Sequence, residues 1–321
     1  MFDVITFGSG TKDVYFVFKH LPKGFLGDET LDIKFGVKLE ADDVLFRSGG
    51  GGTNVAVALR KMGYNVAWAG MVGNDDEGKS VLDELRDYDV NTSLAMTIDS
   101  KKTNQSAILI SPGKDRSIII YRGASSEFGK ENIIWEQLQS KWFYIGPGGG
   151  KSSDLFCDLI KFAKQKKTKI FFNPGARQIE VLKKKCKDLL MEVDVLSINE
   201  EEFRDLTGKI FISEKQLAKD FAKLTNGIWI YTRGKKGSIV GDGKNIYTAG
   251  IIEVPVVDNT GAGDSYNAGF LASYIKNGDI IQAIQLGTAN SAKNVTDWGA
   301  KAPILAIGEN YSKVEVKVKK M

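Results

Sequence analysis

WFYIGPGGGKSSDLFCDLIKFAKQKKTKIFFNPG, residues 142–175, joins two short apolar runs through an amphipathic stretch. The apolar runs at its two ends have the length of buried strands, and residues 153–164 between them carry apolar side chains at helical spacing. The same alternation continues on both sides, in residues 66–88 and 178–206. Alternating strands and helices predict an α/β fold with a doubly wound, mostly parallel sheet that has helices on both faces.

Two regions interrupt this rhythm and show strand patterns with no helix between them. Residues 33–40 (IKFGVKLE) alternate with period two, and residues 106–123 predict a hairpin that turns at Pro112 to Asp115. Together with the run VYFVF they predict a small sheet outside the main one. Such a sheet, formed by about 14–46 and 102–122, is placed to cover a site at the strand ends, as lids do.

The composition fits one large α/β domain over residues 1–321, because a chain that is 42% hydrophobic at this length can bury a large core. The 44 basic and 40 acidic residues leave a net charge of +4, which gives no argument for nucleic-acid binding. The N-terminus lacks the pattern of a signal peptide, and no run approaches the roughly twenty apolar residues of a membrane span. We therefore expect a cytoplasmic protein with neither membrane nor nucleic acid as partner.

The cysteine and histidine content limits the chemistry. Cys157 and Cys186 are the only cysteines, and their helix-like contexts favour a reducing compartment over a disulfide. His20 is the sole histidine and is interpreted as a loop residue, so Ser-His-Asp catalysis and His-rich metal sites are not expected. The C-terminal alternation KVEVKVKK predicts a charged edge strand.

A P-loop spelling occurs at Gly73–Ser80 (GNDDEGKS), after a predicted strand and at the start of a predicted helix. Three of its four variable positions are carboxylates, which would repel the triphosphate that such a loop has to attract. We therefore interpret it as a turn whose acidic residues favour the start of a helix. The rival hypothesis is a P-loop NTPase that uses Lys79. A second near-match, Gly146–Ser152, is one residue short of the P-loop spacing.

The loop Gly8–Asp13 follows the predicted strand DVITF and begins like a dinucleotide-binding fingerprint. Asp13 replaces the third glycine, and a strand-like run follows where that fingerprint needs a helix, so the Rossmann interpretation fails. A polar loop with one carboxylate remains, suited to accept hydrogen bonds from sugar hydroxyls. A turn capped by Asp13 explains the same residues equally well.

The loop Asp258–Asp264 (DNTGAGD) leads into SYNAGFLASYIKNG, which predicts a helix that closes at Gly278. Small residues leave the loop amides uncovered, and the positive end of the helix adds to them, so this turn is suited to hold an anion. Asp264 places a negative charge beside those amides. Phosphoryl transfer accounts for it, because the acceptor hydroxyl needs a base while preorganised donors hold the phosphate.

Two stretches, GGGGTNVAVALRKMG at Gly49–Gly63 and DNTGAGDSYNAGF at Asp258–Phe270, resemble the diagnostic motifs of ribokinase-like carbohydrate kinases, the family named for the minor phosphofructokinase. The resemblance spans nearly the whole chain. It implies transfer of phosphate from ATP to a sugar hydroxyl, that of a primary alcohol. It makes Asp264 the catalytic base and forms the anion hole from Gly261, Ala262 and Gly263.

The resemblance also implies binding positions, and the match to the family is less specific at those that lie outside the two motifs. The acceptor positions are Asp13, Thr11, Gly50, Gly51 and Asn54. The nucleotide positions are Asn199, Thr232, Gly234, Gly237 and Asn290, with the pair Gly299–Ala300 nearby. Mg²⁺ is implied indirectly at Glu202, and a monovalent cation such as K⁺ at Asp258 and Thr260. Arg122, just past the run SIIIY, is a candidate for contact with a substrate phosphate or else an ordinary surface charge.

The acceptor stays open at this point. Thr11 stands where ribose kinases favour asparagine, and Gly146-Pro147-Gly148 occupies the place of the strand-end glutamate of those enzymes. Ribose, a ketohexose such as fructose, an adenosine-like nucleoside and a sugar phosphate therefore all remain. A non-catalytic sugar or nucleotide sensor is the rival from another class, against which Asp264, Asn199 and Glu202 count. Lids of this family often pair two subunits, so a homodimer through the lid and a lid that covers the site of a monomer both remain open.

Overall fold

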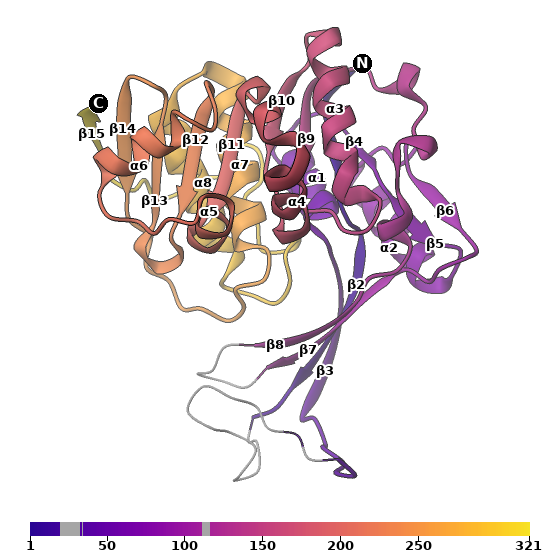
Figure 1. The fold of residues 1–321 in the computed structure, drawn as a ribbon. Coiled ribbons are helices and arrows are strands. Elements are labelled where there is room, and N and C mark those ends of the chain that lie inside the picture. The colour runs from indigo at the N-terminus through magenta and orange to yellow at the C-terminus, as the bar shows by residue number, and fades with distance from the viewer. Residues whose placement is uncertain (20–32, 34, 111–115) are drawn as a thin grey trace.

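A nine-stranded sheet forms the body of the computed structural model, which describes residues 1–19, 33, 35–110 and 116–321 (Figure 1). The strand order is β15-β14-β13-β12-β11-β10-β9-β1-β4, and neighbours from β4 to β12 run parallel whereas β12 to β15 run antiparallel. The charged C-terminal run lies at the sheet edge as β15, which confirms that prediction. The strands are β1 (Phe2–Phe7), β4 (Val66–Ala69), β9 (Ser140–Ile145), β10 (Lys169–Phe172), β11 (Val195–Asn199), β12 (Ile228–Thr232), β13 (Ser238–Gly241), β14 (Asn245–Ala249) and β15 (Val316–Lys320).

Helices cover both faces of this sheet, as predicted, because consecutive strand residues point to opposite sides. In β10, for example, Phe171 belongs to one hydrophobic core and Phe172 to the other. One face packs against α1 (Gly51–Lys61), α2 (Asp76–Asp87), α7 (Ala262–Asn277) and α8 (Ile280–Asn294). The other packs against α3 (Ser152–Lys166), α4 (Ala176–Val181), α5 (Glu200–Thr207) and α6 (Glu214–Phe221). Shorter helical turns are Ala124–Glu127, Lys130–Asn132, Trp135–Gln137, Leu182–Cys186, Lys187–Glu192 and Gly234–Lys236.

A separate sheet, here called the lid, extends below the body in Figure 1, and its strands lie in or next to the regions 14–46 and 102–122 from which a lid was predicted; that it covers a site stays a prediction. Its order is β3 (Asp43–Gly49), β2 (Thr11–Val17), β7 (Asn104–Ile110) and β8 (Ser117–Tyr121). The antiparallel pair β7–β8 confirms the hairpin, whose predicted turn at Pro112 to Asp115 lies outside the described residues, as does His20. A small parallel pair, β5 (Met71–Gly73) and β6 (Met96–Ile98), adjoins the body.

The predicted strand at 33–40 is wrong for the residues that the structure describes there. Residue 33 and residues 35–40 form no strand, and Gly36 adopts a φ of 81°, which makes a turn. The lid instead takes β3 from the residues just before the first glycine motif, paired antiparallel with β2 from Val17↔Asp43 to Thr11↔Gly49. The lid strand therefore leads directly into α1 and its glycines.

The two cysteines form a disulfide, contrary to the expectation from the sequence. Cys157 on α3 and Cys186 in the turn Leu182–Cys186 lie 29 residues apart in the chain, with Cα atoms 6.5 Å apart, within the usual range for a disulfide. Their helix-like contexts did not reveal that the two segments pack together. Cysteine usage therefore gives no argument for a reducing compartment. No helix in the described part of the chain is long and apolar enough to cross a membrane.

Reduction of this bond is expected to lower the free energy of unfolding by about 3 kcal/mol, the scale for a closed loop of this length. Thermal unfolding with and without reductant measures the loss, and Cys157→Ser should be insensitive to reductant. Titration of two free thiols in protein prepared without reductant would contradict the pairing.

Candidate active site

Asp264 lies at the carboxyl edge of the sheet, in the first turn of α7, and faces the first turns of α1. Asn54 Nδ2 on α1 donates to Asp264 Oδ2 over 2.8 Å. Burial raises the pKa of Asp264, whereas the bond from Asn54 and the charge of Lys301 oppose that rise. The side chain keeps partial exposure, so a ligand at the sheet edge can reach it. A carboxylate oriented by a neutral amide and held at a raised pKa is suited to accept a proton.

The loop before α7 has the uncovered amides that the sequence predicts. The amides of Gly261 and Gly263 donate to no group among the described residues, and Ala262 N makes only a long bond of 3.3 Å to Asn259 O. Gly261 has a φ of 76°, and a Cβ there would lie 2.3 Å from Ala300 Cβ, so this position needs glycine. The helix closes at Gly278, with a φ of 69°, as predicted. The loop therefore offers free donors at the positive end of a helix.

The glycines at the start of α1 bring the main chain close to Asp264. A Cβ at Gly51 would lie 3.0 Å from Pro147 Cδ and 3.4 Å from Asp264 Oδ1. Gly50 has a φ of 100°, and a Cβ there would lie 2.2 Å from Ser9 O. A side chain at Gly51 would fill the space beside the carboxylate, so this glycine leaves it open to a small ligand, whereas a side chain at Gly50 would collide with the main chain of Ser9.

Asp13 occupies a buried position on β2, at the base of the lid, and is 5% exposed. Burial raises its pKa to about 6, although a hydrogen bond from Ser106 and the charge of Lys301 favour the ionised form. A Cβ at Gly49 would lie 2.0 Å from Asp13 Oδ2, so Gly49 makes room for this carboxylate. Thr11 points to the same face of β2 and is also buried. Asp13 therefore lies within a strand and is not the cap of a turn.

Arg122 is exposed and follows β8, at the side of the lid that faces the loop after β9. A Cβ at Gly149 would lie 3.6 Å from Arg122 Cδ and 3.7 Å from its Nη1, so the guanidinium lies along the glycine-rich loop Gly146–Gly150. That loop also contains Pro147, which packs against Gly51. Arg122 thus lies beside the loop whose Pro147 contacts Gly51, one of the predicted acceptor positions.

Asn199 and Glu202 form a capping box at the start of α5, where β11 ends. Glu202 N donates to Asn199 Oδ1 over 2.8 Å, and Asn199 N donates to Glu202 Oε2 over 2.9 Å. Burial, together with the charges of Glu201, Asp264 and Asp205, raises the pKa of Glu202 to about 7. A partly exposed carboxylate with this surplus of negative charge around it fits a nearby divalent cation.

Thr232 pairs with Asn199 in the parallel register of β11 and β12, so the predicted nucleotide positions meet at one sheet edge. Beyond Thr232 the chain turns tightly, with a φ of 52° at Gly234 and 78° at Gly237, and Arg233 N donates to Gly237 O. The segment is a β-hairpin between β12 and β13, as its glycines predict.

Asn290 is fully buried on α8, and both ends of its side chain bond to the main chain. Its Nδ2 donates to Ser265 O over 2.8 Å, and Leu305 N donates to its Oδ1 over 2.8 Å. The side chain therefore joins the first turns of α7 to the segment that follows Gly299–Ala300. Asn290 therefore holds these two segments together, and its predicted contact with a nucleotide stays a prediction.

Asp258 is 2% exposed and organises the loop in front of α7. Its carboxylate accepts from Thr260 N over 2.9 Å, Thr260 Oγ1 over 2.7 Å and Gly299 N over 3.1 Å. All three donors are uncharged. Burial and the negative charge of Asp258 raise the pKa of Tyr15.

Sequence reasoning missed a chain of neutral polar groups under the site. Ser197 Oγ on β11 donates to Asn267 Oδ1 on α7 over 2.7 Å, and Asn173 Nδ2 donates to Ser197 O over 2.9 Å. Tyr144 OH lies 3.4 Å from Asn173 Oδ1 and 3.5 Å from Asn267 Nδ2. Asn267 is one helical turn beyond Asp264, so this network fixes the helix that carries the base. Polar residues at the ends of adjacent apolar runs were the available signal.

The P-loop spelling at Gly73–Ser80 serves the helix start, which confirms its interpretation as a turn. Asp75 is the N-cap of α2, and its Oδ1 accepts from Gly78 N over 2.9 Å. Its Oδ2 accepts from Thr103 N over 2.9 Å. The Asp75 carboxylate thus accepts hydrogen bonds from main-chain amides, among them that of Gly78 in this loop, whereas a P-loop donates its amides to phosphate.

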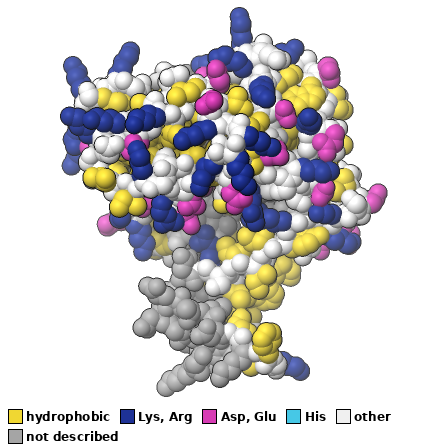
Figure 2. Space-filling model, in the orientation of Figure 1, with side chains coloured by type: hydrophobic (Ala, Val, Ile, Leu, Met, Phe, Trp, Pro, Cys, Tyr) yellow, Lys and Arg dark blue, Asp and Glu magenta, His cyan; other side chains and the backbone are white. Residues whose placement is uncertain are grey.

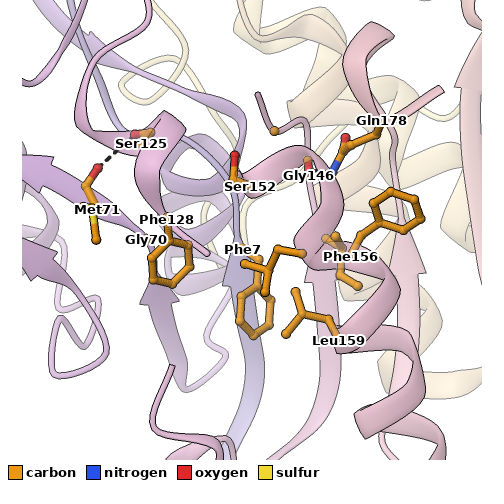
Figure 3. A pocket seen from close by; sticks show the side chains of 14 residues that line it. Phe7, Gly70, Met71, Ser125, Phe128, Gly146, Ser152, Phe156, Leu159 and Gln178 are labelled. Carbon is orange, nitrogen blue, oxygen red and sulfur yellow. Dashed lines mark hydrogen bonds between the residues drawn. The ribbon is translucent and has the colours of Figure 1, made fainter. Parts of the chain in front are cut away.

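Two hollows lie outside the candidate site. A cavity of about 20 Å³ lies behind Gly146. Figure 3 shows the apolar side chains that line it, such as Phe7, Phe156 and Leu159. It has room for about one water molecule and none for a sugar. A polar hollow of about 550 Å³ lies beside Asp194 and Ile228, at the amino ends of β11 and β12, and so at the edge opposite Asp264.

A carboxylate beside uncovered amides at a helix start, at the carboxyl edge of a lidded α/β sheet, defines a small-molecule kinase. In the described residues no group of three or more His, Cys, Asp or Glu side chains is arranged to hold a metal ion.

Comparison with known proteins agrees with this class. A family model described as pfkB family carbohydrate kinase matches residues 26–307. The chain is 27% identical over 286 residues to a ribokinase of Haemophilus influenzae, covering 84% of this chain and 88% of the relative. It is 25% identical over 253 residues to a nucleoside kinase of Methanocaldococcus jannaschii, covering 76% and 78%. The structure of Arabidopsis thaliana ribokinase complexed with ribose and ATP matches with a TM-score of 0.77 at 22% identity, covering 94% and 95%. The chain belongs to the pfkB family of carbohydrate kinases.

Glu202→Gln is expected to stabilise the protein above pH 7. A carboxyl whose folded pKa is raised makes the fold lose stability as pH rises from the unfolded pKa through about 7, and glutamine avoids this loss while keeping the acceptor for Asn199 N. The gain at pH 8 should be about 1–2 kcal/mol, less than the full shift implies because the side chain is partly exposed, and should vanish near pH 5.

Thermal unfolding at pH 5 and pH 8 measures this difference. Glu201→Gln is the matched control, since the Glu201 side chain is 77% exposed in the same helical turn and should change stability by no more than about 0.5 kcal/mol. Equal or lower stability of Glu202→Gln at pH 8 would contradict the assigned environment.

Proposed function

We propose that this kinase transfers the γ-phosphate of ATP to a primary hydroxyl of a sugar, either ribose or a ketohexose such as fructose. The observation that carries the proposal is the bond from Asn54 to Asp264, which holds a carboxylate of raised pKa beside free loop amides. In the proposed reaction Asp264 takes the proton of the acceptor hydroxyl. The acceptor oxygen bonds to the γ-phosphorus, the bond from that phosphorus to the bridging β-phosphate oxygen breaks, and ADP leaves.

The acceptor is proposed to bind between the lid base and α1. Asp13 and Thr11 face it from β2, and Gly50, Gly51 and Asn54 let its hydroxyls approach the main chain. Besides the hydrogen bond from Ser106, the buried carboxylate of Asp13 can accept a further one, which a sugar hydroxyl supplies. Arg122 lies where a phosphate on a larger acceptor would extend, along Gly149. A panel of ribose, fructose, a sugar phosphate and adenosine in an ADP-release assay distinguishes these acceptors, including the nucleoside alternative.

The nucleotide is proposed to bind along the ends of β11 and β12. The positions on that edge are Asn199, Thr232, Gly234 and Gly237, and Asn290 holds the first turns of α7 to the segment at Leu305. The residues fit two cations. Glu202 would help to hold Mg²⁺, which when bound neutralises phosphate charge, and Asp258 with Thr260 would hold a monovalent cation such as K⁺, because the buried Asp258 carboxylate has only uncharged donors around it.

Asp264→Asn is expected to lower turnover by roughly 10² to 10⁴-fold while leaving fold and nucleotide binding intact, since it removes the base alone. Steady-state kinetics of ADP release measures the loss, and circular dichroism checks the fold. Lys79→Ala is the control, because Lys79 belongs to the turn that caps α2, and its turnover should stay within about twofold. Near-normal turnover in Asp264→Asn would end the assignment, and loss of ATP use in Lys79→Ala would favour the P-loop hypothesis.

A homodimer through the lid is part of the proposal. Hydrophobic side chains gather along the lid below the body in Figure 2, and Phe46 is 58%, Ile119 65% and Ile120 51% exposed. Strand β8 is an edge strand whose residues Ser117–Tyr121 are all exposed, and another chain can pair with such an edge. A second copy of this lid offers the same apolar face and so forms a self-complementary interface.

Phe46→Lys combined with Ile119→Lys is expected to convert a dimer into a monomer, because two charges would be buried in the interface. Size-exclusion chromatography with light scattering measures the mass. Ile210→Lys is the control, since Ile210 is 70% exposed and lies outside the lid. A monomeric wild type at micromolar concentration would contradict the dimer.

A further inference from the structure

The segment Trp298–Lys301, here called the bridge segment, contacts the loop Asp258–Asp264 before α7, here called the phosphate loop. Gly299 N donates to Asp258 Oδ2 over 3.1 Å. Ala300 packs so closely on Gly261 that a Cβ added there would lie 2.3 Å from Ala300 Cβ. The position of Gly261, and with it the loop amides, therefore depends on where the bridge segment lies.

The same segment contacts the lid. The Trp298 ring packs edge to face on Tyr15 of β2, with ring centroids 5.8 Å apart. A Cβ at Gly299 would lie 3.1 Å from Arg47 Cγ of β3, so the main chain of the segment lies against the lid side chains. Consecutive residues of the bridge segment therefore contact both the lid and the phosphate loop.

Lys301 anchors the end of the bridge segment in a buried polar cluster. Its Nζ donates to Ser48 Oγ of β3 and lies 3.6 Å from Glu84 Oε2 of α2, and Ser48 Oγ donates to the same carboxylate. Lys301 is 3% exposed. A buried ammonium costs free energy of desolvation, and burial accordingly lowers its pKa. A lysine that anchored the segment from the protein surface would not carry this desolvation cost.

The charge of Lys301 acts on both carboxylates of the site. It favours the ionised forms of Asp13 and Asp264 and so lowers the pKa of each against the effect of burial. Asp13 also faces Asp258, which raises its pKa, and Lys12, which lowers it. Around Asp264 the other acidic groups are Glu202 and the phenol of Tyr144, and Asn54 is its hydrogen-bond donor.

We propose that Lys301 is a positioning residue for phosphoryl transfer. It ties the base of the lid to the phosphate loop, so that an acceptor held under the lid lies in line with the transferred phosphate. The inference rests on the proposed function for its kinetic readout. A lysine that only stabilised the fold would change neither the pH at which activity is lost nor the coupling between lid and loop.

Lys301→Met is expected to lower kcat/KM roughly 10²-fold, the scale of a small misplacement of reacting groups. The substrate is whichever of D-ribose, D-fructose and adenosine the wild type phosphorylates. The acid limb of the pH profile should move to higher pH, because the positive charge near Asp13 and Asp264 is lost. Lys293→Met is the matched control: it removes an exposed pair with Glu309 in the same part of the chain and should change neither quantity.

Ser48→Ala separates position from charge, since it removes the lid partner of Lys301 and keeps the ammonium. It is expected to raise the KM for the acceptor and to leave the acid limb in place. It also decides the question if Lys301→Met fails to fold. Wild-type kcat/KM with an unmoved acid limb in folded Lys301→Met, or a wild-type KM in Ser48→Ala, would overturn the proposal.

Hydrogen exchange tests the coupling between lid and phosphate loop without turnover. It therefore remains decisive if the wild type phosphorylates none of the three acceptors. That result would count against the proposed function but not against the coupling. Ser48→Ala touches the lid cluster but not the phosphate loop. It is expected to speed amide exchange roughly threefold or more in residues 258–264 as well as in 43–49. Unchanged exchange in 258–264 would overturn the inference even in an active kinase.

Discussion

The hydrogen bond from Asn54 to Asp264 is the interaction on which the site depends, because it joins the first turns of α1 and α7 at the carboxyl edge of the sheet. It orients the carboxylate with a neutral donor, so burial can still raise the pKa of Asp264. The free amides of Gly261 and Gly263 lie beside it. Base and anion site are thus built from two helix starts that the sheet brings together.

The surrounding structure holds these helix starts in place. Below the site, Ser197 and Asn267 connect β11 to the helix that carries the base, and Asn290 connects that helix to the segment after the bridge. On the lid side of the site, strand β3 leads directly into the glycines of α1. A movement of the lid base is therefore transmitted at short range to α1 through the chain and to the phosphate loop through the bridge segment. Both routes end at the groups around Asp264.

The alternation of strands and helices, the hairpin and the helix start at Asp264 could be predicted from the sequence, because each depends on local periodicity or on uncovered amides at a turn. The lid strand at Asp43–Gly49 was missed because its pairing with β2 is a tertiary contact, and Gly36 breaks the strand pattern expected before it. The disulfide and the cluster of Lys301 with Ser48 and Glu84 were missed for the same reason. Their members lie far apart in the chain, and nothing in the neighbouring sequence marks either partner.

The most direct test of the account is a crystal structure with ADP, an aluminium fluoride mimic of the transferred phosphate and the sugar that the enzyme turns over. We expect one acceptor hydroxyl within about 3.2 Å of the Asp264 carboxylate, with the fluoride on the amides of residues 261–263. A hydroxyl bound out of reach of Asp264, or a fluoride held elsewhere, would contradict it.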